Sequence, residues 1–158
     1  MKVAFFHGLE SPAMSEKNEI LEEIFGTENV YAPAMDYRNP EMFRTVLEHL
    51  QSHPVDLLVG SSMGGYFAHC ISSITGIETL LFNPAVHSRS MEPQNVMCGN
   101  KTPLQSLVLG KRDAIINLDF TLDYFIEDNT SFPIEINIED MGHRVPADIF
   151  RKHLINQK

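Results

Sequence analysis

The sequence has few cysteines, no long apolar run and a deficit of positive charge. Its 158 residues include two cysteines, Cys70 and Cys98, which are too few for a disulfide framework and lack metal-ligand spacing. No apolar stretch approaches the roughly 20 residues that a membrane-spanning helix requires. The 21 acidic and 12 basic residues leave a net charge of −9, which disfavours nucleic acid and anionic membrane surfaces as partners. We therefore expect a protein of the reducing cytoplasm that binds neither nucleic acid nor membrane.

The length and composition are those of one globular domain. Hydrophobic residues make up 43% of the chain, which is normal for a soluble protein and allows a sizeable core. Because no internal repeat or interdomain linker is found, we predict a single domain over residues 1–158. The apolar run at the N-terminus is too short for a signal peptide and lacks a cleavage site of small residues, so it indicates a buried first strand.

Short apolar runs alternate with amphipathic stretches along the chain. The amphipathic stretches predict helices that begin near Ser15, Pro40, Ser62, Leu118 and Pro146. Alternation of this kind implies a doubly wound α/β domain with a mostly parallel sheet. The runs predicted as strands are Lys2–His7, Asn29–Ala32, Val55–Val59, Thr79–Phe82, Ser106–Leu109 and Ile134–Ile138.

Two stretches depart from the general pattern. In Ile134–Ile138 isoleucines alternate with polar residues, which predicts an edge strand with one solvent-exposed face. The polar stretch from Pro84 to Pro103 is long for a connection in a compact domain, so we expect it to be either functional or mobile. It begins at the carboxyl end of a strand, which is where open α/β sheets bind their ligands.

A serine motif follows the third predicted strand. The residues from Gly60 to Gly64 read Gly-x-Ser-x-Gly, centred on Ser62, between an apolar run and a helical stretch. This context is typical of a nucleophile elbow, in which the serine takes an unusual backbone conformation and its neighbours two positions away must be small. Gly60 and Gly64 meet that need for Ser62, whereas Ser61 has no such neighbours. We therefore predict that Ser62 is a nucleophile.

A serine nucleophile needs a base and a group that orients the base. In this kind of sheet an acid and then a histidine are expected after later strands. His143 follows the last predicted strand closely and is the candidate base, and Asp113 follows Ser106–Leu109 and is the candidate acid. Asp119 is the main rival of Asp113, although we expect it in the first turn of a helix. Asp140 lies too close to His143 in sequence to orient it.

Two backbone amides are candidates for an oxyanion hole. The first predicted strand ends in His7-Gly8-Leu9, and in this architecture the loop after that strand supplies one donor, here the Leu9 N–H. The Met63 N–H is the second, at the N-terminus of a helix whose dipole favours negative charge. We expect His7 to shape the oxyanion loop by hydrogen bonds. Ser11 either starts a turn or helix or contacts the substrate at the mouth of the site.

The other histidines and both cysteines are assigned no chemistry. His49, His53, His69 and His87 have no spacing that suggests a metal site. We expect His153, inside the last predicted helix, to be solvated. Cys70 is expected to be a small core residue, and Cys98 lies in a polar loop where it is expected to be exposed.

Several motifs occur in a fixed order along nearly the whole chain: Phe6-His7-Gly8-Leu9-Glu10-Ser11-Pro12, Gly60–Gly65, Asn83-Pro84-Ala85-Val86, Gly110-x-x-Asp113 and Gly142-His143. Together they resemble the small YqiA-like esterases of the α/β-hydrolase superfamily. The resemblance implies a minimal α/β-hydrolase fold with about six mostly parallel strands and helices on both faces. It also implies a Ser-Asp-His triad and no cofactor. The segment after Val86 is shorter than in that family, which implies little or no lid.

The predicted function is cleavage of carboxylic esters or thioesters of small acyl groups through an acyl-enzyme. An open site favours short acyl esters, or a substrate that a larger carrier delivers. Two alternatives stay open at this point. One is a non-catalytic binding module with the same fold, and the other is transfer of the acyl group to an acceptor other than water, which shares the acyl-enzyme intermediate.

Overall fold

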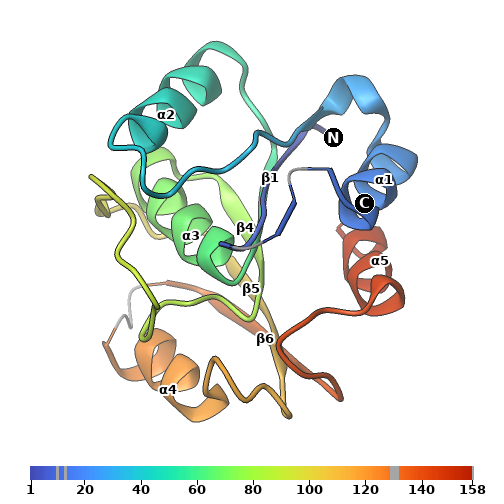
Figure 1. Ribbon diagram of the computed structural model, residues 1–158, viewed down its shortest axis with the longest axis vertical. Helices are drawn as coiled ribbons and strands as arrows, with labels where there is room; N and C mark the ends of the chain where they lie inside the picture. Colours follow the sequence, from blue (N-terminus) through green and yellow to red (C-terminus); the bar gives the residue numbers. More distant parts are fainter. Residues whose placement is uncertain (10, 13, 129–131, 158) are drawn as a thin grey trace.

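The computed structural model describes residues 1–9, 11–12, 14–128 and 132–157 (Figure 1). Its centre is a six-stranded sheet with the order β2-β1-β3-β4-β5-β6, in which every neighbouring pair is parallel. This arrangement confirms the predicted α/β fold. The strands are β1 (Val3–Phe6), β2 (Val30–Tyr31), β3 (Leu57–Ser61), β4 (Glu78–Phe82), β5 (Gln105–Gly110) and β6 (Ile134–Glu139).

Helices cover both faces of the sheet, as predicted (Figure 1). α1 (Glu16–Phe25) and α5 (Ala147–Ile155) pack against each other and cover one face. α2 (Met42–Ser52), α3 (Met63–Thr75) and α4 (Leu118–Asp123) lie over the other face. Two short elements complete the fold, a 3-10 turn over Thr27–Asn29 and a π turn over Tyr124–Asp128. None of the described helices is both long and apolar enough to cross a membrane.

The ends of the helices follow from local sequence. Ser15 precedes α1, and Gly26 ends it with a φ of 89°. Gly76 ends α3 in the left-handed conformation, with a φ of 84°, which glycine adopts without a steric penalty. Pro146 precedes α5 with a φ of −61°, close to the value that its ring imposes. These local signals explain why the predicted helix boundaries agree with the observed ones to within a few residues.

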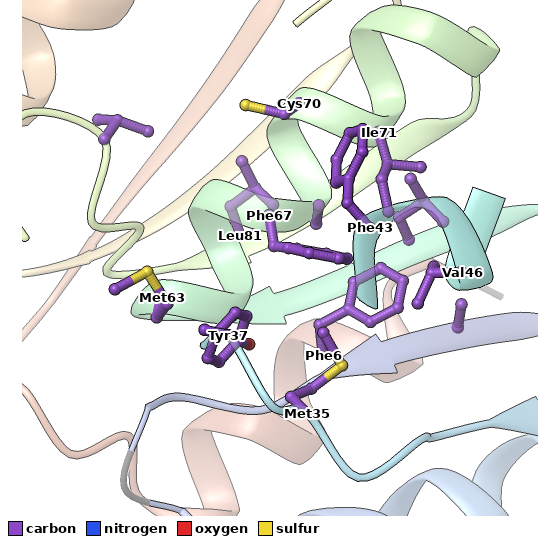
Figure 2. Packing of buried hydrophobic residues seen from close by; sticks show 14 of the residues in the cluster. Phe6, Met35, Tyr37, Phe43, Val46, Met63, Phe67, Cys70, Ile71 and Leu81 are labelled. Atoms are coloured by element: carbon purple, nitrogen blue, oxygen red, sulfur yellow. The ribbon is translucent and has the colours of Figure 1, made fainter. Parts of the chain in front are cut away.

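The core beneath α2 and α3 is built around one aromatic ring (Figure 2). Phe67 of α3 makes edge-on contacts with Phe6, Tyr37 and Phe43, with ring centroids 5.2 to 5.7 Å apart. Such edge-to-face pairs are favourable beyond the area that they bury. Because Phe6 ends β1 and Met63 begins α3, this cluster fixes the start of α3 against the end of the first strand.

The stretch from Pro84 to Pro103 contains no helix or strand, in agreement with the prediction of little or no lid. It is held by hydrogen bonds along its length. Arg89 Nη1 donates to the carbonyl oxygens of Ala85 and Val86 at 3.0 and 2.8 Å. Farther along, the Gly99 amide donates to Ser73 Oγ at 2.8 Å. The Arg89 bonds stabilise a local fold within the first half of the segment, and the Gly99 bond anchors the second half to α3.

The predicted edge position of the last strand is confirmed, because within the described part of the chain β6 pairs with β5 alone. The prediction that one of its faces is buried is wrong in the second half of the strand. Ile136 and Ile138 are 38% and 53% exposed, and Glu135 and Asn137 are exposed as well. The physical reason is that neither hydrophobic core extends over these side chains at the outermost strand.

The prediction that His153 is solvated is also wrong. Its side chain is buried, and its Nε2 lies 2.7 Å from Glu139 Oε1. Phe150, three positions earlier on α5, is fully buried, and residues three positions apart on a helix lie side by side. His153 is therefore buried because α5 packs this side of the helix against the sheet.

Candidate active site

Ser62 lies on the sharp turn between β3 and α3. Its φ of 55° and ψ of −118° are unusual for a residue with a side chain. The flanking glycines allow this turn to pack closely. A Cβ atom at Gly64 would lie 1.9 Å from the Phe6 carbonyl oxygen, and one at Gly60 would lie 2.4 Å from the Gly64 carbonyl oxygen. This backbone geometry agrees with the elbow predicted from the Gly-x-Ser-x-Gly pattern.

The structure brings together the three side chains that the sequence singled out. His143 Nε2 lies 3.0 Å from Ser62 Oγ, and His143 Nδ1 lies 2.8 Å from Asp113 Oδ2. Because a carboxylate only accepts hydrogen bonds, Nδ1 carries the proton and Nε2 accepts from the Ser62 hydroxyl. The three residues follow β3, β5 and β6, so they meet at the carboxyl edge of the parallel sheet. An imidazole in this tautomer can take a proton from the serine.

Asp113 is held rigidly behind His143. Its side chain is 1% exposed, and its Oδ1 accepts hydrogen bonds from the Ile115 and Ile116 amides, both at 2.8 Å. The rival Asp119 lies in the first turn of α4, as expected. Asp140 forms a surface ion pair with Arg112 at 2.7 Å. Of these acids, Asp113 is the one hydrogen bonded to His143.

Asn83 connects the ends of two strands with the loop that carries His143. Its Nδ2 donates to the carbonyl oxygens of Gly142 and His143, both at 3.1 Å, and its Oδ1 accepts from the Gly110 amide at 2.7 Å. It has a φ of 43°, which asparagine tolerates better than most residues. Asn83 belongs to one of the motifs in the sequence, but the sequence pattern predicts no role for it. Its position directly after a strand, at the edge that binds ligands, is the signal that could have identified it.

The two amides predicted for the oxyanion hole lie beside Ser62. Leu9 and Met63 line a cavity of about 260 Å³ together with Ser62. Within the described part of the chain, neither amide donates a hydrogen bond to another group of the protein. Neither amide is therefore engaged by a competing acceptor among the described residues.

His7 holds the loop that follows β1. Its Nε2 accepts a hydrogen bond from the Met35 amide at 3.0 Å, and its Nδ1 lies 2.8 Å from the Gly8 carbonyl oxygen. The Tyr37 hydroxyl donates to the His7 carbonyl oxygen. These contacts agree with the predicted loop-shaping role. The Ser11 amide closes a turn on Gly8 at 3.2 Å, which agrees with the first of its two alternatives, and the residue also lines the cavity at Ser62; Glu10 lies outside the described residues.

The remaining histidines and the cysteines have structural contacts. Among the described residues, no group of three or more His, Cys, Asp or Glu side chains could hold a metal ion. His69 is buried against Gln105 at 3.0 Å, and this burial lowers its pKa. Cys70 is buried and Cys98 is exposed, as expected, and both are free thiols.

Residues 2–123 match the model of the family described as uncharacterised protein family UPF0227, so the chain belongs to that family. No curated protein matches the chain in sequence. The resemblance to UPF0227 therefore identifies the family, and the fold is identified by solved structures.

Solved structures with a similar fold come from the α/β-hydrolase superfamily. A protein of Xanthomonas campestris pv. campestris described as a hydrolase of that superfamily has a TM-score of 0.64 and 18% identity, with 98% of each chain covered. An α/β serine hydrolase homologue from Coxiella burnetii has a TM-score of 0.69 and 15% identity, with 99% of this chain and 84% of that chain covered. An esterase from Pyrococcus furiosus has a TM-score of 0.69 and 12% identity over 99% of this chain and 79% of that one. The chain thus has the α/β-hydrolase fold.

Proposed function

We propose that the protein is a serine hydrolase that cleaves carboxylic esters or thioesters of small acyl groups. The observation that carries this proposal is the continuous chain of hydrogen bonds from Ser62 Oγ through His143 to the buried Asp113 carboxylate. A serine on a strained turn, a correctly oriented imidazole and a buried acid are the three parts that acyl transfer needs. Two proteins with a similar fold, described as a serine hydrolase homologue and an esterase, support the same class.

The first half of the proposed reaction forms an acyl-enzyme. Ser62 Oγ attacks the carbonyl carbon while its proton passes to His143 Nε2, and the oxyanion is held by the amides of Leu9 and Met63. The bond from the carbonyl carbon to the leaving oxygen or sulfur then breaks, and its electron pair stays with the leaving atom. That atom takes the proton from His143. Asp113 stabilises the imidazolium that exists between the two proton transfers.

The second half of the reaction releases the acid. A water molecule gives a proton to His143 and attacks the acyl carbon, and the bond to Ser62 Oγ breaks as that oxygen recovers the proton. The products are a carboxylic acid and the free enzyme. Transfer of the acyl group to another acceptor follows the same steps with that acceptor in place of water.

The shape of the site supports small acyl groups. The cavity of about 260 Å³ beside the oxyanion amides is lined by Leu9, Met63, Ala85, Ile115 and Ile116, together with Ser88, Arg89 and Ser90. It lies just below the usual range of about 300 to 1,000 Å³ for small-molecule pockets. A cavity of this size, with apolar side chains on part of its lining, favours a short acyl chain.

The proposal is tested by covalent labelling and by ester hydrolysis. A fluorophosphonate should attach to Ser62, as identified by peptide mass spectrometry, and short-chain nitrophenyl esters should be hydrolysed. The Ser62→Ala variant should lose the label and about three to six orders of magnitude in kcat. Ser61→Ala is the matched control and should keep the label. If Ser62→Ala hydrolyses the esters as fast as the wild type, the proposed mechanism is wrong. If folded wild-type protein takes no label, the result favours the non-catalytic binding module.

A further inference from the structure

The candidate active site opens into a longer cleft. A cavity of about 490 Å³ contains Ser62 and His143 in its lining, and a second cavity of about 520 Å³ extends from it past Phe5, Pro146 and Ala147. The two cavities share lining residues and therefore lie next to each other. The described side chains that line both include Ser11, Lys17 and Arg144.

Two cationic side chains lie in this shared part of the cleft. Lys17 comes from the first turn of α1, and its Nζ lies 5.4 Å from the centroid of the Phe150 ring. Arg144 directly follows His143. Burial, together with the positive charge of Arg144, lowers the pKa of Lys17 to about 8. Among the described residues, neither cation forms an ion pair with a carboxylate.

This arrangement contrasts with the charge of the whole protein. The net charge is −9, yet none of the described residues that line the cavity at Ser62 is acidic. Glu16 lines the outer cavity and is solvent exposed, and Asp113 is covered by its contact with His143. Lys17 is half-buried and Arg144 is exposed. Two like charges held close together are unfavourable, above all where one of them is desolvated, unless a group of opposite charge joins them. An anionic group of a bound ligand would satisfy both cations.

The position of His143 shows which part of a substrate reaches these cations. His143 lines the cavity that contains Lys17 and Arg144 but not the smaller cavity, whereas Met63 lines the smaller cavity but not the larger one, and Leu9 lines both. In the proposed reaction the leaving atom takes its proton from the histidine, whereas the carbonyl oxygen lies at the oxyanion amides. The leaving group therefore extends into the cationic part of the cleft, and the acyl group occupies the smaller cavity.

We propose that Lys17 and Arg144 form an anion subsite for the leaving group. The preferred substrates are then esters or thioesters whose alcohol or thiol carries a carboxylate or a phosphate. This inference rests on the proposed function of the same site. Neither cation changes its covalent state in the reaction, so both act by binding and orienting the substrate. Both therefore raise kcat/KM for substrates with an anionic leaving group relative to kcat/KM for substrates with a neutral one.

Matched pairs of esters test the inference. The acetyl ester of 3-hydroxybenzoate carries an anion on the leaving group, and the acetyl ester of 3-hydroxybenzamide is its neutral isostere. We expect kcat/KM to be about 10- to 100-fold higher for the anionic ester, because a hydrogen bond to a charged group is about twice as strong as a neutral one. The acetyl ester of 3-hydroxyphenyl phosphate separates phosphate from carboxylate recognition. Monophenyl succinate, which carries its anion on the acyl side, should show no such advantage over phenyl succinamate.

Substitutions identify the residues responsible. Lys17→Met and Arg144→Gln should each lower the ratio of anionic to neutral kcat/KM by about tenfold. Lys17→Arg keeps the charge and should keep most of the ratio. Arg38→Gln is the matched control, because Arg38 is an exposed cation outside the cavities at the site. Circular dichroism of each variant checks that it is folded.

A binding measurement separates failure of this inference from failure of the proposed function. Folded Ser62→Ala protein should bind 3-hydroxybenzoate at least tenfold more tightly than 3-hydroxybenzamide, as measured by NMR titration. Equal kcat/KM for the two acetyl esters together with equal binding would overturn the anion subsite while leaving the hydrolase intact. Preferential binding of the anion without hydrolysis of any ester would overturn the hydrolase and leave the anion site. An advantage for monophenyl succinate alone would overturn the assignment to the leaving group.

Discussion

The side-chain amide of Asn83 donates a hydrogen bond to the carbonyl oxygen of His143 at 3.1 Å, although the two residues are far apart in sequence. The same side chain accepts from the Gly110 amide. Asn83 therefore joins the carboxyl ends of β4 and β5 to the loop that carries the imidazole. The position of His143 relative to Ser62 depends on this link across the sheet.

Asn83→Asp should lower kcat by about 10- to 100-fold with little change in KM, because it removes both donors to the His143 loop and a misplaced base loses rate steeply. The aspartate keeps the acceptor for Gly110 and tolerates the positive φ. The measurement is steady-state hydrolysis of a short nitrophenyl ester. Asn95→Asp is the matched control, since Asn95 also has a positive φ but bonds Pro40 at the surface. Equal loss in both variants would contradict the positioning role.

Asp113→Asn should reduce kcat by about four orders of magnitude, because an amide in this place favours the wrong imidazole tautomer. The rival Asp119 supplies the control. Asp119→Asn changes an exposed carboxylate in the first turn of α4 and should leave kcat within about twofold. The same hydrolysis assay decides between them, and a large loss in Asp119→Asn alone would reverse the assignment of the acid.

Gly64→Ala should destabilise the fold by at least about 3 kcal/mol, because the added Cβ overlaps backbone atoms that cannot move away easily. That Cβ would lie 1.9 Å from the Phe6 carbonyl oxygen. Gly142→Ala is the matched control, since its Cβ would have the Arg112 carbonyl oxygen at 3.7 Å as its neighbour, and it should change stability by less than about 1 kcal/mol. Urea unfolding measures both, and similar midpoints for the two variants would contradict the close packing at the elbow.

The preference for anionic leaving groups should weaken as the pH rises through about 8. Burial and Arg144 lower the pKa of Lys17 to about 8, so the lysine is charged below that pH and loses its proton above it, while the substrate carboxylate stays ionised. Profiles of kcat/KM against pH report groups of the free enzyme. We expect kcat/KM for the acetyl ester of 3-hydroxybenzoate, divided by kcat/KM for the acetyl ester of 3-hydroxybenzamide, to fall above pH 8 in the wild type. In Lys17→Arg this ratio should stay level. A level ratio in both proteins would show that Lys17 does not titrate in this range.

The exposed thiol of Cys98 should react with iodoacetamide at neutral pH. A hydrogen bond from Cys70 lowers the pKa of Cys98 to about 7, whereas the same contact and burial raise the pKa of Cys70. Because the thiolate is the reactive form, the alkylation rate should rise with a midpoint near pH 7. Cys70→Ala removes the donor and should move the midpoint upward. A wild-type midpoint near the ordinary value of 9 would contradict the thiol contact.

Much of the fold was predictable because its signals are local. Apolar runs, glycine helix ends such as Gly26 and Gly76, and the glycines around Ser62 each act within a few residues of their own position. The order of Ser62, Asp113 and His143 was predictable for a related reason. Parallel strands place their carboxyl ends at one edge, so residues that follow different strands meet there whatever their separation in sequence.

The incorrect or missing predictions involve contacts between distant segments. The exposure of Ile136 and Ile138 depends on which elements cover the outermost strand, and the burial of His153 depends on how α5 packs against the sheet, where Glu139 is its partner. In the sequence Asn83 is one residue of a motif, and its role follows only from its hydrogen bonds to Gly110 and His143. No periodicity reports such contacts, because each depends on the relative placement of elements that are separated in the chain.

The amino-acid sequence by itself determined the class of fold, the serine at the elbow and the order of the residues behind it. Backbone sterics and hydrophobic periodicity act locally and suffice for these features. Only the tertiary structure decided that His143 lies within hydrogen-bond distance of both Ser62 and Asp113. It also decided that Lys17 of α1 and Arg144 of a late loop share one cleft, because the distance between two side chains follows from how the sheet and helices pack around them.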